Sequence, residues 1–296
     1  MFANVILAGC QKSGSTSLAD YLSQHPDCLL SSPKENGFFS KAANLADVSR
    51  YARHFTSAPG QTPKALVDAT TAYMPDPRIP GLLHGALGPD LKFIFILRAP
   101  ATRAYSGYMH LYKRGQERRD PEAVFGGLKP DTTWAESEEM RRLARAIMAG
   151  SVSPEVYRGQ YDDELWPFQY IANTAYRRQI ERFETVFGPN RVLVLTFEQA
   201  VAAPAELAET MGRFLEVDPT LFPNGLPHRN ATKIPTKPGL RTRLARIVKG
   251  RPNAVDVKPQ PTKASPEIAA SLQTLFAPET DYWSERLGQD LRAVGW

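Results

Sequence analysis

Cysteines are scarce in this sequence, and long apolar runs are absent from it. With only Cys10 and Cys28 among 296 residues, neither a disulfide scaffold nor a cysteine-based zinc site is expected. No apolar run approaches the roughly 20 residues of a membrane-spanning helix, so we expect no stable membrane insertion. No secretory leader pattern precedes the first apolar run. If Met1 is the natural start, we expect a cytoplasmic protein, although a truncated luminal domain would have the same pattern.

The overall composition is that of a globular protein with a substantial core. Hydrophobic residues make up 42% of the chain and charged residues 23%. The predicted strands alternate with helices, which favours one α/β domain over residues 1–296. The net charge of +5 suits an anionic ligand. We expect no nucleic-acid partner, and the sequence does not indicate an oligomeric state.

The first eighteen residues predict a strand, a tight turn and a helix start. Val5–Ala8 is a short apolar run that suits a buried parallel strand. A small, polar turn with two glycines follows, and apolar side chains recur at helical spacing from Thr16 onward. Free backbone N–H groups and the helix dipole at such a junction form a phosphate site. The residues expected to hold the phosphate are Lys12, Ser13, Gly14, Ser15, Thr16 and Ser17.

This turn is not a Walker A loop, because Lys12 lies two residues before Gly14 instead of directly after it. A second candidate phosphate site follows Leu91–Leu97, which reads as another buried strand. Arg98 comes at its end, Pro100 is suited to start a helix, and Ser106 lies about two turns along that helix. An arginine and a serine placed in this way could hold one phosphate together.

The two motifs together resemble those of sulfotransferases that use PAPS (3′-phosphoadenosine 5′-phosphosulfate). The first turn resembles the family's 5′-phosphosulfate loop, with Gln11 where proline is usual. The run from Leu97 to Tyr108 resembles its 3′-phosphate motif. The resemblance implies a three-layer α/β fold with a mainly parallel sheet and a P-loop-like phosphosulfate loop. It also implies PAPS as cosubstrate, PAP as product, an acceptor substrate and no metal requirement.

Two residues compete for the role of general base. The run from Lys34 to Phe39 resembles a motif of the carbohydrate-type and bacterial branch of the family, in which the position of Glu35 is the proposed base. A solvent-exposed Lys–Glu pair would give the same sequence. His110 lies one turn beyond Ser106 and is the rival base; the other histidines are His25, His54, His84 and His228. Some related sequences carry an active-site lysine at the position of Ala69.

The remaining elements are expected from periodicity and composition. Strands are expected at residues 65–68 and 191–195, and helices at residues 41–62, 134–148, 170–187 and 204–215. Residues 114–131 have few apolar side chains and no period, which predicts a mobile loop. Residues 219–266 are rich in proline and basic, which predicts extended loops; Lys233 in this stretch could meet a cofactor phosphate. The amphipathic run 240–249 is interpreted as a packed helix.

Three functions remain open from the sequence. The first is transfer of a sulfuryl group to a hydroxyl or amine of a small-molecule, carbohydrate or lipid acceptor, with Lys12 stabilising charge on the leaving oxygen. The second is a P-loop small-molecule kinase, for which Asp68 at a strand end is the candidate magnesium ligand. The third is a non-catalytic protein that binds a nucleotide.

Overall fold

The core of the molecule is a parallel β-sheet. The computed structural model describes residues 1–57, 60, 62–227 and 263–296. Among these residues, five strands form one sheet in the order β2-β3-β1-β4-β5, and every pairing is parallel. The strands are β1 (Val5–Gly9), β2 (Cys28–Leu30), β3 (Ala65–Asp68), β4 (Lys92–Leu97) and β5 (Val192–Thr196). The α/β fold with a mainly parallel sheet, expected from the sequence, is confirmed.

The central strands are apolar throughout because helices cover both faces of the sheet. Successive side chains of a strand point to opposite faces, so Ile6 and Ala8 of β1 pack in one core while Val5 and Leu7 pack in another. Helices α1 (Ser15–Leu22) and α8 (Pro204–Leu215) cover the face of Val5. The face of Ile6 is covered by α2 (Ile79–Leu87), α6 (Tyr176–Phe187) and α11 (Ala277–Leu287). These are the three expected layers.

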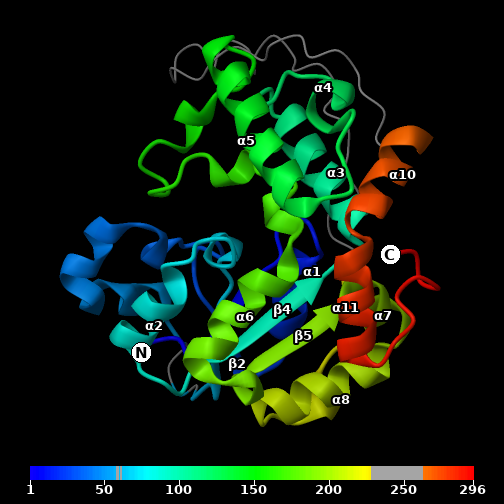
Figure 1. The fold of residues 1–296 in the computed structure, drawn as a ribbon. Helices are drawn as coiled ribbons and strands as arrows, with labels where there is room; N and C mark the ends of the chain where they lie inside the picture. Colours follow the sequence, from blue (N-terminus) through cyan, green and yellow to red (C-terminus); the bar gives the residue numbers. More distant parts are fainter. Residues whose placement is uncertain (58–59, 61, 228–262) are drawn as a thin grey trace, which may run out of the picture.

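A separate helical layer stands beyond the carboxyl ends of the strands (Figure 1). It contains α3 (Pro100–Tyr112), α4 (Pro121–Phe125), α5 (Thr132–Met148) and α10 (Pro266–Leu275), which share a third apolar cluster. The arrows of β4 and β5 point toward it in Figure 1. Parallel sheets bind ligands at this edge, so the layer and the sheet together frame the candidate site. Helix α7 (Phe197–Ala202) directly follows β5.

Two predicted helices differ from those observed. The expected helix over residues 41–62 is a run of 3₁₀ turns, η2 (Ala42–His54), with Asp47 in a non-helical conformation. The expected helix over residues 170–187 begins only at Tyr176, because residues 170–175 form η6 (Ala172–Thr174) and bend toward the loop after β1. The other 3₁₀ elements are η1 (Phe38–Ser40), η3 (Thr71–Tyr73), η4 (Pro154–Tyr157), η5 (Trp166–Phe168), η7 (Pro189–Arg191) and η8 (Pro219–Leu221).

Residues 114–131 are more structured than their composition indicates. This stretch holds α4, whose Phe125 is fully buried. Glu117 is also fully buried, forms an ion pair with Arg119 at 2.6 Å and accepts a hydrogen bond from Tyr170 at 3.0 Å. The expectation of a mobile loop was wrong. The segment has few apolar side chains, but the buried Glu117–Arg119 ion pair and the packing of Phe125 hold it in place.

Much of the proline-rich stretch lies outside the described residues. Residues 228–262 are among those not described, and they include Lys233, His228 and the amphipathic run 240–249. No helix in the described part of the chain combines the length and apolar character that crossing a membrane requires.

Candidate functional site

The loop between β1 and α1 has the backbone that an anion site needs. Lys12 and Gly14 both have positive φ, 72° and 92°. A side chain at Gly14 would overlap the ring of Phe197, so glycine is required here by both conformation and space. Gly14 caps α1 without a side-chain hydrogen bond. The N–H groups of the first turn of α1 therefore remain without intrahelical partners, beside the positive end of the helix dipole.

A buried arginine of α3 holds the loop in place from the protein interior. Arg103 of α3 is 1% exposed, and its Nε donates to the carbonyl of Gln11 at 3.0 Å. Its Nη1 donates to the Tyr170 carbonyl at 3.1 Å and to Thr174 Oγ1 at 3.2 Å. The N–H of Cys10 donates to the Ile96 carbonyl at 2.9 Å. The guanidinium thus ties the loop to α3 and to the bend before α6.

Positive charge is concentrated at this loop. The pKa of Lys12 is lowered from its ordinary value, first by burial and then by the charges of Arg114, Arg98, Arg103 and Lys113. Four cations, from the residue after β4, from α3 and from the residues directly after α3, therefore lie close enough to Lys12 to repel it. The four charges that lower the pKa of Lys12 are all positive. A cluster of this kind is costly unless an anion occupies it.

Arg98 and Ser106 belong to the connection from β4 into α3. Arg98 follows the last residue of β4, and its guanidinium lies over the ring of Phe197, 5.4 Å from the centroid. Within the described residues, neither the Arg98 guanidinium nor the Ser106 hydroxyl has a hydrogen-bond or ion-pair partner. Both side chains are half-buried. They are available for a phosphate, as the sequence motif predicts.

One member of the predicted phosphate set is placed differently. Ser13 is fully buried, and its N–H donates to the Cys10 carbonyl at 3.3 Å. The Ser13 hydroxyl has no hydrogen-bond partner within the described residues, and its contact with a ligand stays a prediction. Ser15 and Ser17 are largely buried in the first turn of α1, while Thr16 is half-buried. The amides of this turn, rather than a row of hydroxyls, are its main donors.

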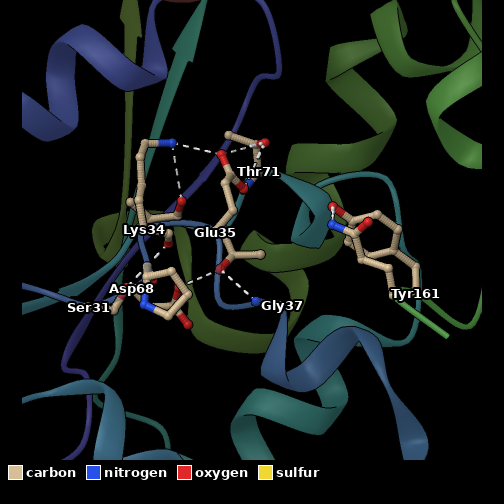
Figure 2. A network of polar contacts seen from close by, with 11 residues as sticks. Ser31, Lys34, Glu35, Gly37, Asp68, Thr71 and Tyr161 are labelled. Carbon is tan, nitrogen blue, oxygen red and sulfur yellow. Dashed lines mark hydrogen bonds and ion pairs between the residues drawn. The ribbon is translucent and has the colours of Figure 1, made fainter. Parts of the chain in front are cut away.

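Glu35 lies on a loop beside the end of β3, held by specific contacts (Figure 2). The N–H of Thr71 donates to its Oε2 at 2.8 Å, and the Thr71 hydroxyl donates to the same carboxylate at 3.2 Å. Lys34 Nζ lies 2.7 Å from Glu35 Oε1 and also donates to the Ala69 carbonyl at 3.4 Å. The Glu35 side chain remains 41% exposed. Because a carboxylate offers about four lone-pair sites, one stays free for a proton.

Asp68, at the end of β3, holds this loop through a chain of hydrogen bonds. It is fully buried, and it accepts hydrogen bonds from the hydroxyls of Thr70 (2.6 Å), Tyr51 (2.7 Å) and Tyr73 (3.1 Å). Thr70 Oγ1 in turn accepts from the N–H of Gly37 at 3.3 Å. Burial raises the pKa of Asp68 above its ordinary value. Its oxygens face hydroxyls inside the protein, so the structure does not offer Asp68 as a magnesium ligand.

His110 lies on the cationic side of the site. Burial, followed by the charges of Lys12 and Arg114, lowers the pKa of His110 to about 3. The imidazole is therefore neutral at physiological pH in the free protein. A bound anion would neutralise the two cations and raise this pKa. His110 thus remains near the reacting groups, but the free site makes it a weak base.

Several site residues were not assigned a role from the sequence. Lys34 appeared only as part of a motif, yet its ammonium reaches Ala69, the position where some relatives carry a lysine. Arg103 is part of the 3′-phosphate motif, and that motif was the only signal for it. The sequence places Arg114 in a loop, and nothing in the sequence indicates the stacking of Phe197 on Arg98.

In the described part of the chain, no group of three or more His, Cys, Asp or Glu side chains could hold a metal ion.

Comparison with known proteins identifies the family. Residues 3–231 match the family described as "Sulfotransferase domain". The chain belongs to this sulfotransferase family. It is similar to the bifunctional heparan sulfate N-deacetylase/N-sulfotransferase 1 of Xenopus laevis, with 29% identity over 220 residues, covering 73% of this chain and 22% of that protein. The mouse protein of the same name is 28% identical over 224 residues, covering 74% of this chain and 23% of that protein.

The sulfotransferase chain thus spans less than a quarter of the length of these relatives. A solved structure, a sulfotransferase from Alicyclobacillus acidocaldarius, superposes with a TM-score of 0.66 and covers 99% of both chains at 24% identity. This likeness supports the fold. The P-loop-like fold expected from the two phosphate motifs is confirmed, and so is the membership of the sulfotransferase family.

Proposed function

We propose that this chain transfers a sulfuryl group from PAPS to a hydroxyl or an amine of an acceptor and releases PAP. The observation that carries the proposal is the cluster of cations around Lys12, beside the free first-turn amides of α1. PAPS is a polyanion, and both of its phosphate groups have a matching set of donors here. The names of the relatives include an N-sulfotransferase, so we keep both nitrogen and oxygen as possible acceptor atoms.

The donor side of the site divides between the two phosphates. The amides and hydroxyls of residues 14–17 would hold the 5′-phosphosulfate. Arg98 and Ser106 would hold the 3′-phosphate, which PAP carries and ADP lacks. The choice of PAPS over ATP would therefore depend on these two side chains.

The reaction exchanges one bond to sulfur for another. The acceptor oxygen or nitrogen attacks sulfur, and the bond from sulfur to the bridging oxygen of the phosphosulfate breaks. The electron pair of that bond stays on the leaving PAP. Lys12, in a partly buried position, would stabilise this charge more in the transition state than in the bound donor.

The proton of the acceptor needs a base on the opposite side. Glu35 is positioned for this by Thr71 and Lys34, and its remaining lone pair is open to solvent. The ion pair with Lys34 at 2.7 Å holds this carboxylate in place. We therefore prefer Glu35 to His110 as the base, because the free site holds the pKa of His110 at about 3.

Thermal unfolding with PAP and with ADP tests the donor assignment. A ligand that binds only the folded state raises the melting temperature. We expect PAP to raise it far more than ADP at equal concentration. Arg98→Ala should weaken PAP binding by about 1.5–3 kcal/mol, the usual range for a charge-assisted hydrogen bond. Arg145→Ala, an exposed arginine on α5, is the matched control. Equal shifts with both nucleotides would refute the 3′-phosphate assignment.

Transfer assays separate the proposal from its alternatives. Sulfur-labelled PAPS and a broad acceptor panel should give a labelled product together with PAP. Magnesium-dependent consumption of ATP without sulfate transfer would instead indicate a small-molecule kinase. Tight PAP binding without turnover on any acceptor would indicate a non-catalytic nucleotide-binding protein.

A further inference from the structure

A cavity of about 260 Å³ lies beside the loop that carries Glu35. Ser40 from the end of that loop lines it, and so does Ala72, the neighbour of Thr71. Tyr161 and Trp166 come from the segment that precedes α6 and also form part of its wall. The cavity is thus built from the two segments that hold Glu35 and from a third, distant one.

Tyr161 connects the cavity to Glu35. A side-chain atom at Gly37 would lie 3.8 Å from the Tyr161 ring, so the ring stands against the Glu35 loop. Burial, with a smaller contribution from the charge of Glu35, raises the pKa of Tyr161 to about 12. Figure 2 shows Tyr161 across Gly37 from the Glu35 carboxylate. A molecule with its reacting group at Glu35 could therefore extend past Tyr161 into the cavity.

The charge of the cavity is opposite to that of the loop around Lys12. Its charged lining residues are three aspartates, Asp76, Asp162 and Asp163, and one arginine, Arg78. Arg78 pairs with Asp76 at 2.7 Å and with Asp162 at 3.0 Å. Arg182 stands behind this group and donates to the Pro75 carbonyl at 3.5 Å. Three carboxylates and one guanidinium line the cavity, so the charge of its lining is negative, although the charge of Arg114 also reaches Tyr161.

Two buried polar atoms in the walls lack partners. Ser40 is 3% exposed and Trp166 is 6% exposed, and neither Ser40 Oγ nor Trp166 Nε1 has a hydrogen-bond partner within the described structure. Leaving such groups unpaired in a native protein is costly. A ligand with polar atoms would satisfy them. Asp163, in contrast, is already used, since its Oδ1 accepts from the N–H groups of Leu165 (2.8 Å) and Trp166 (3.2 Å).

We propose that this cavity binds the part of the acceptor remote from the sulfated group, and that it selects a polar group with a protonated amine against one with a carboxylate or sulfate. The inference rests on the proposed function, because it treats the molecule at Glu35 as the sulfuryl acceptor. The aromatic walls provide ring faces for a cation or an apolar ring edge. The aspartates provide a negative potential in a concave site, where charge effects are strengthened.

Opposite charges on the two sides of Glu35 have a functional consequence. The polyanionic donor is attracted to the Lys12 side and repelled from the cavity. A polyanionic glycan would be repelled from the cavity in the same way. We therefore expect this chain to favour acceptors that differ in charge from the heparan sulfate named in its relatives.

Three phenols that differ only in their remote substituent test the inference. They are 4-hydroxybenzylamine, 4-hydroxybenzyl alcohol and 4-hydroxybenzoate, with charges of +1, 0 and −1 at neutral pH. The protein is labelled with 5-fluorotryptophan, and the Trp166 resonance is assigned by its loss in Trp166→Phe. Titration at millimolar concentrations then reports binding at the cavity without requiring turnover.

We expect all three phenols to shift the Trp166 resonance, and the amine to bind at least about tenfold more tightly than the carboxylate, with the alcohol between them. Asp163→Asn keeps the acceptor for Leu165 and Trp166 but removes one negative charge, so the ratio should fall by about threefold. Asp90→Asn, an exposed aspartate paired with Arg191 outside this cavity, is the matched control and should leave the ratio unchanged. Added salt should also reduce the ratio in the unmodified protein.

Equal affinity for the amine and the carboxylate, a preference for the carboxylate, or no shift of the Trp166 resonance would overturn the inference. PAP binding, measured in the same samples by thermal unfolding, separates it from the proposed function. If the protein prefers PAP to ADP but does not bind the amine more tightly than the carboxylate, only the cavity assignment is refuted. A clear charge ratio in a protein without PAP preference would leave a cation-selective cavity and refute the 3′-phosphate assignment of the proposed donor site.

Discussion

Arg103 Nε donates a hydrogen bond to the carbonyl of Gln11 at 3.0 Å, which fixes the phosphate loop from inside the protein. The same guanidinium bonds the Tyr170 carbonyl and the Thr174 hydroxyl. Arg103 is 1% exposed, and its hydrogen bonds to Tyr170 and Thr174 are buried, so solvent does not replace the guanidinium there. The residue that the family motif places beside the phosphate site thus positions the loop and adds charge to it.

Arg103→Lys should therefore damage the loop although it keeps the charge. A lysine cannot form the three-way fork. The Tyr170 carbonyl keeps the hydrogen bond from the Thr174 hydroxyl at 2.7 Å, but the Gln11 carbonyl loses its side-chain donor, which costs about 1–3 kcal/mol. We expect a loss of about 2–4 kcal/mol in the free energy of unfolding, measured by denaturant titration, and weaker PAP binding. Arg141→Lys on the exposed side of α5 should change stability by less than about 0.5 kcal/mol. Unchanged PAP affinity in Arg103→Lys would show that the fork does not position the loop.

Lys12→Ala should reduce turnover much more than it weakens PAP binding. Its charge opposes the charge that develops on the leaving oxygen, so most of its effect belongs to the transition state. We expect kcat to fall by about 10²–10³-fold, as for the loss of an oxyanion donor, and the PAP dissociation constant to rise far less. Single-turnover kinetics and PAP titration give the two quantities. Comparable losses in both would mean that Lys12 only binds the donor.

Glu35→Gln should keep PAP affinity and lose about 10²–10⁴-fold in turnover, the usual range for a general base. The amide cannot take the proton, but its oxygen can still accept from the Thr71 N–H. His110→Ala is the control, because that imidazole lies beside Lys12 and Arg114 and its pKa is about 3 in the free protein. An inactive His110→Ala together with an active Glu35→Gln would assign the base to His110.

Glu139 should make stability depend on pH near neutrality. It is 6% exposed on α5, where its two oxygens accept from the N–H groups of Ile171 (2.8 Å) and Ala172 (3.2 Å), and burial raises its pKa to about 7. The unfolded carboxyl titrates near 4.5. Between these values the folded state binds more protons, so its stability falls as the pH rises from 4.5 to 7 and then levels off.

This pKa shift corresponds to about 3 kcal/mol across that interval. Chemical denaturation of the unmodified protein and of Glu139→Gln at several pH values isolates the contribution of Glu139. As the pH rises, we expect the unmodified protein to lose stability relative to Glu139→Gln. A difference that is constant from pH 4.5 to 8 would show that the Glu139 pKa is not raised.

Local sequence determined the phosphate-binding elements of this protein. Gly14 and Lys12 lie within a few residues of a buried strand and a helix start, so backbone sterics and helix-end chemistry alone indicate an anion site. Arg98 and Ser106 are eight residues apart on one strand–helix connection, which is the spacing of the 3′-phosphate motif. The apolar runs of β1, β3, β4 and β5 likewise predicted their strands.

Only the tertiary structure decided what surrounds those elements. Glu35 and Thr71 are 36 residues apart, and Arg103 and Gln11 are 92 apart, so their contacts exist only once the sheet is assembled. The burial of Ser13 and of Asp68 follows from packing against Tyr176 and the buried tyrosines, which no local pattern specifies. The cavity beside Tyr161 joins segments separated by about a hundred residues. Its negative charge arises because side chains from distant parts of the chain meet there, and sequence spacing carries no information about such meetings.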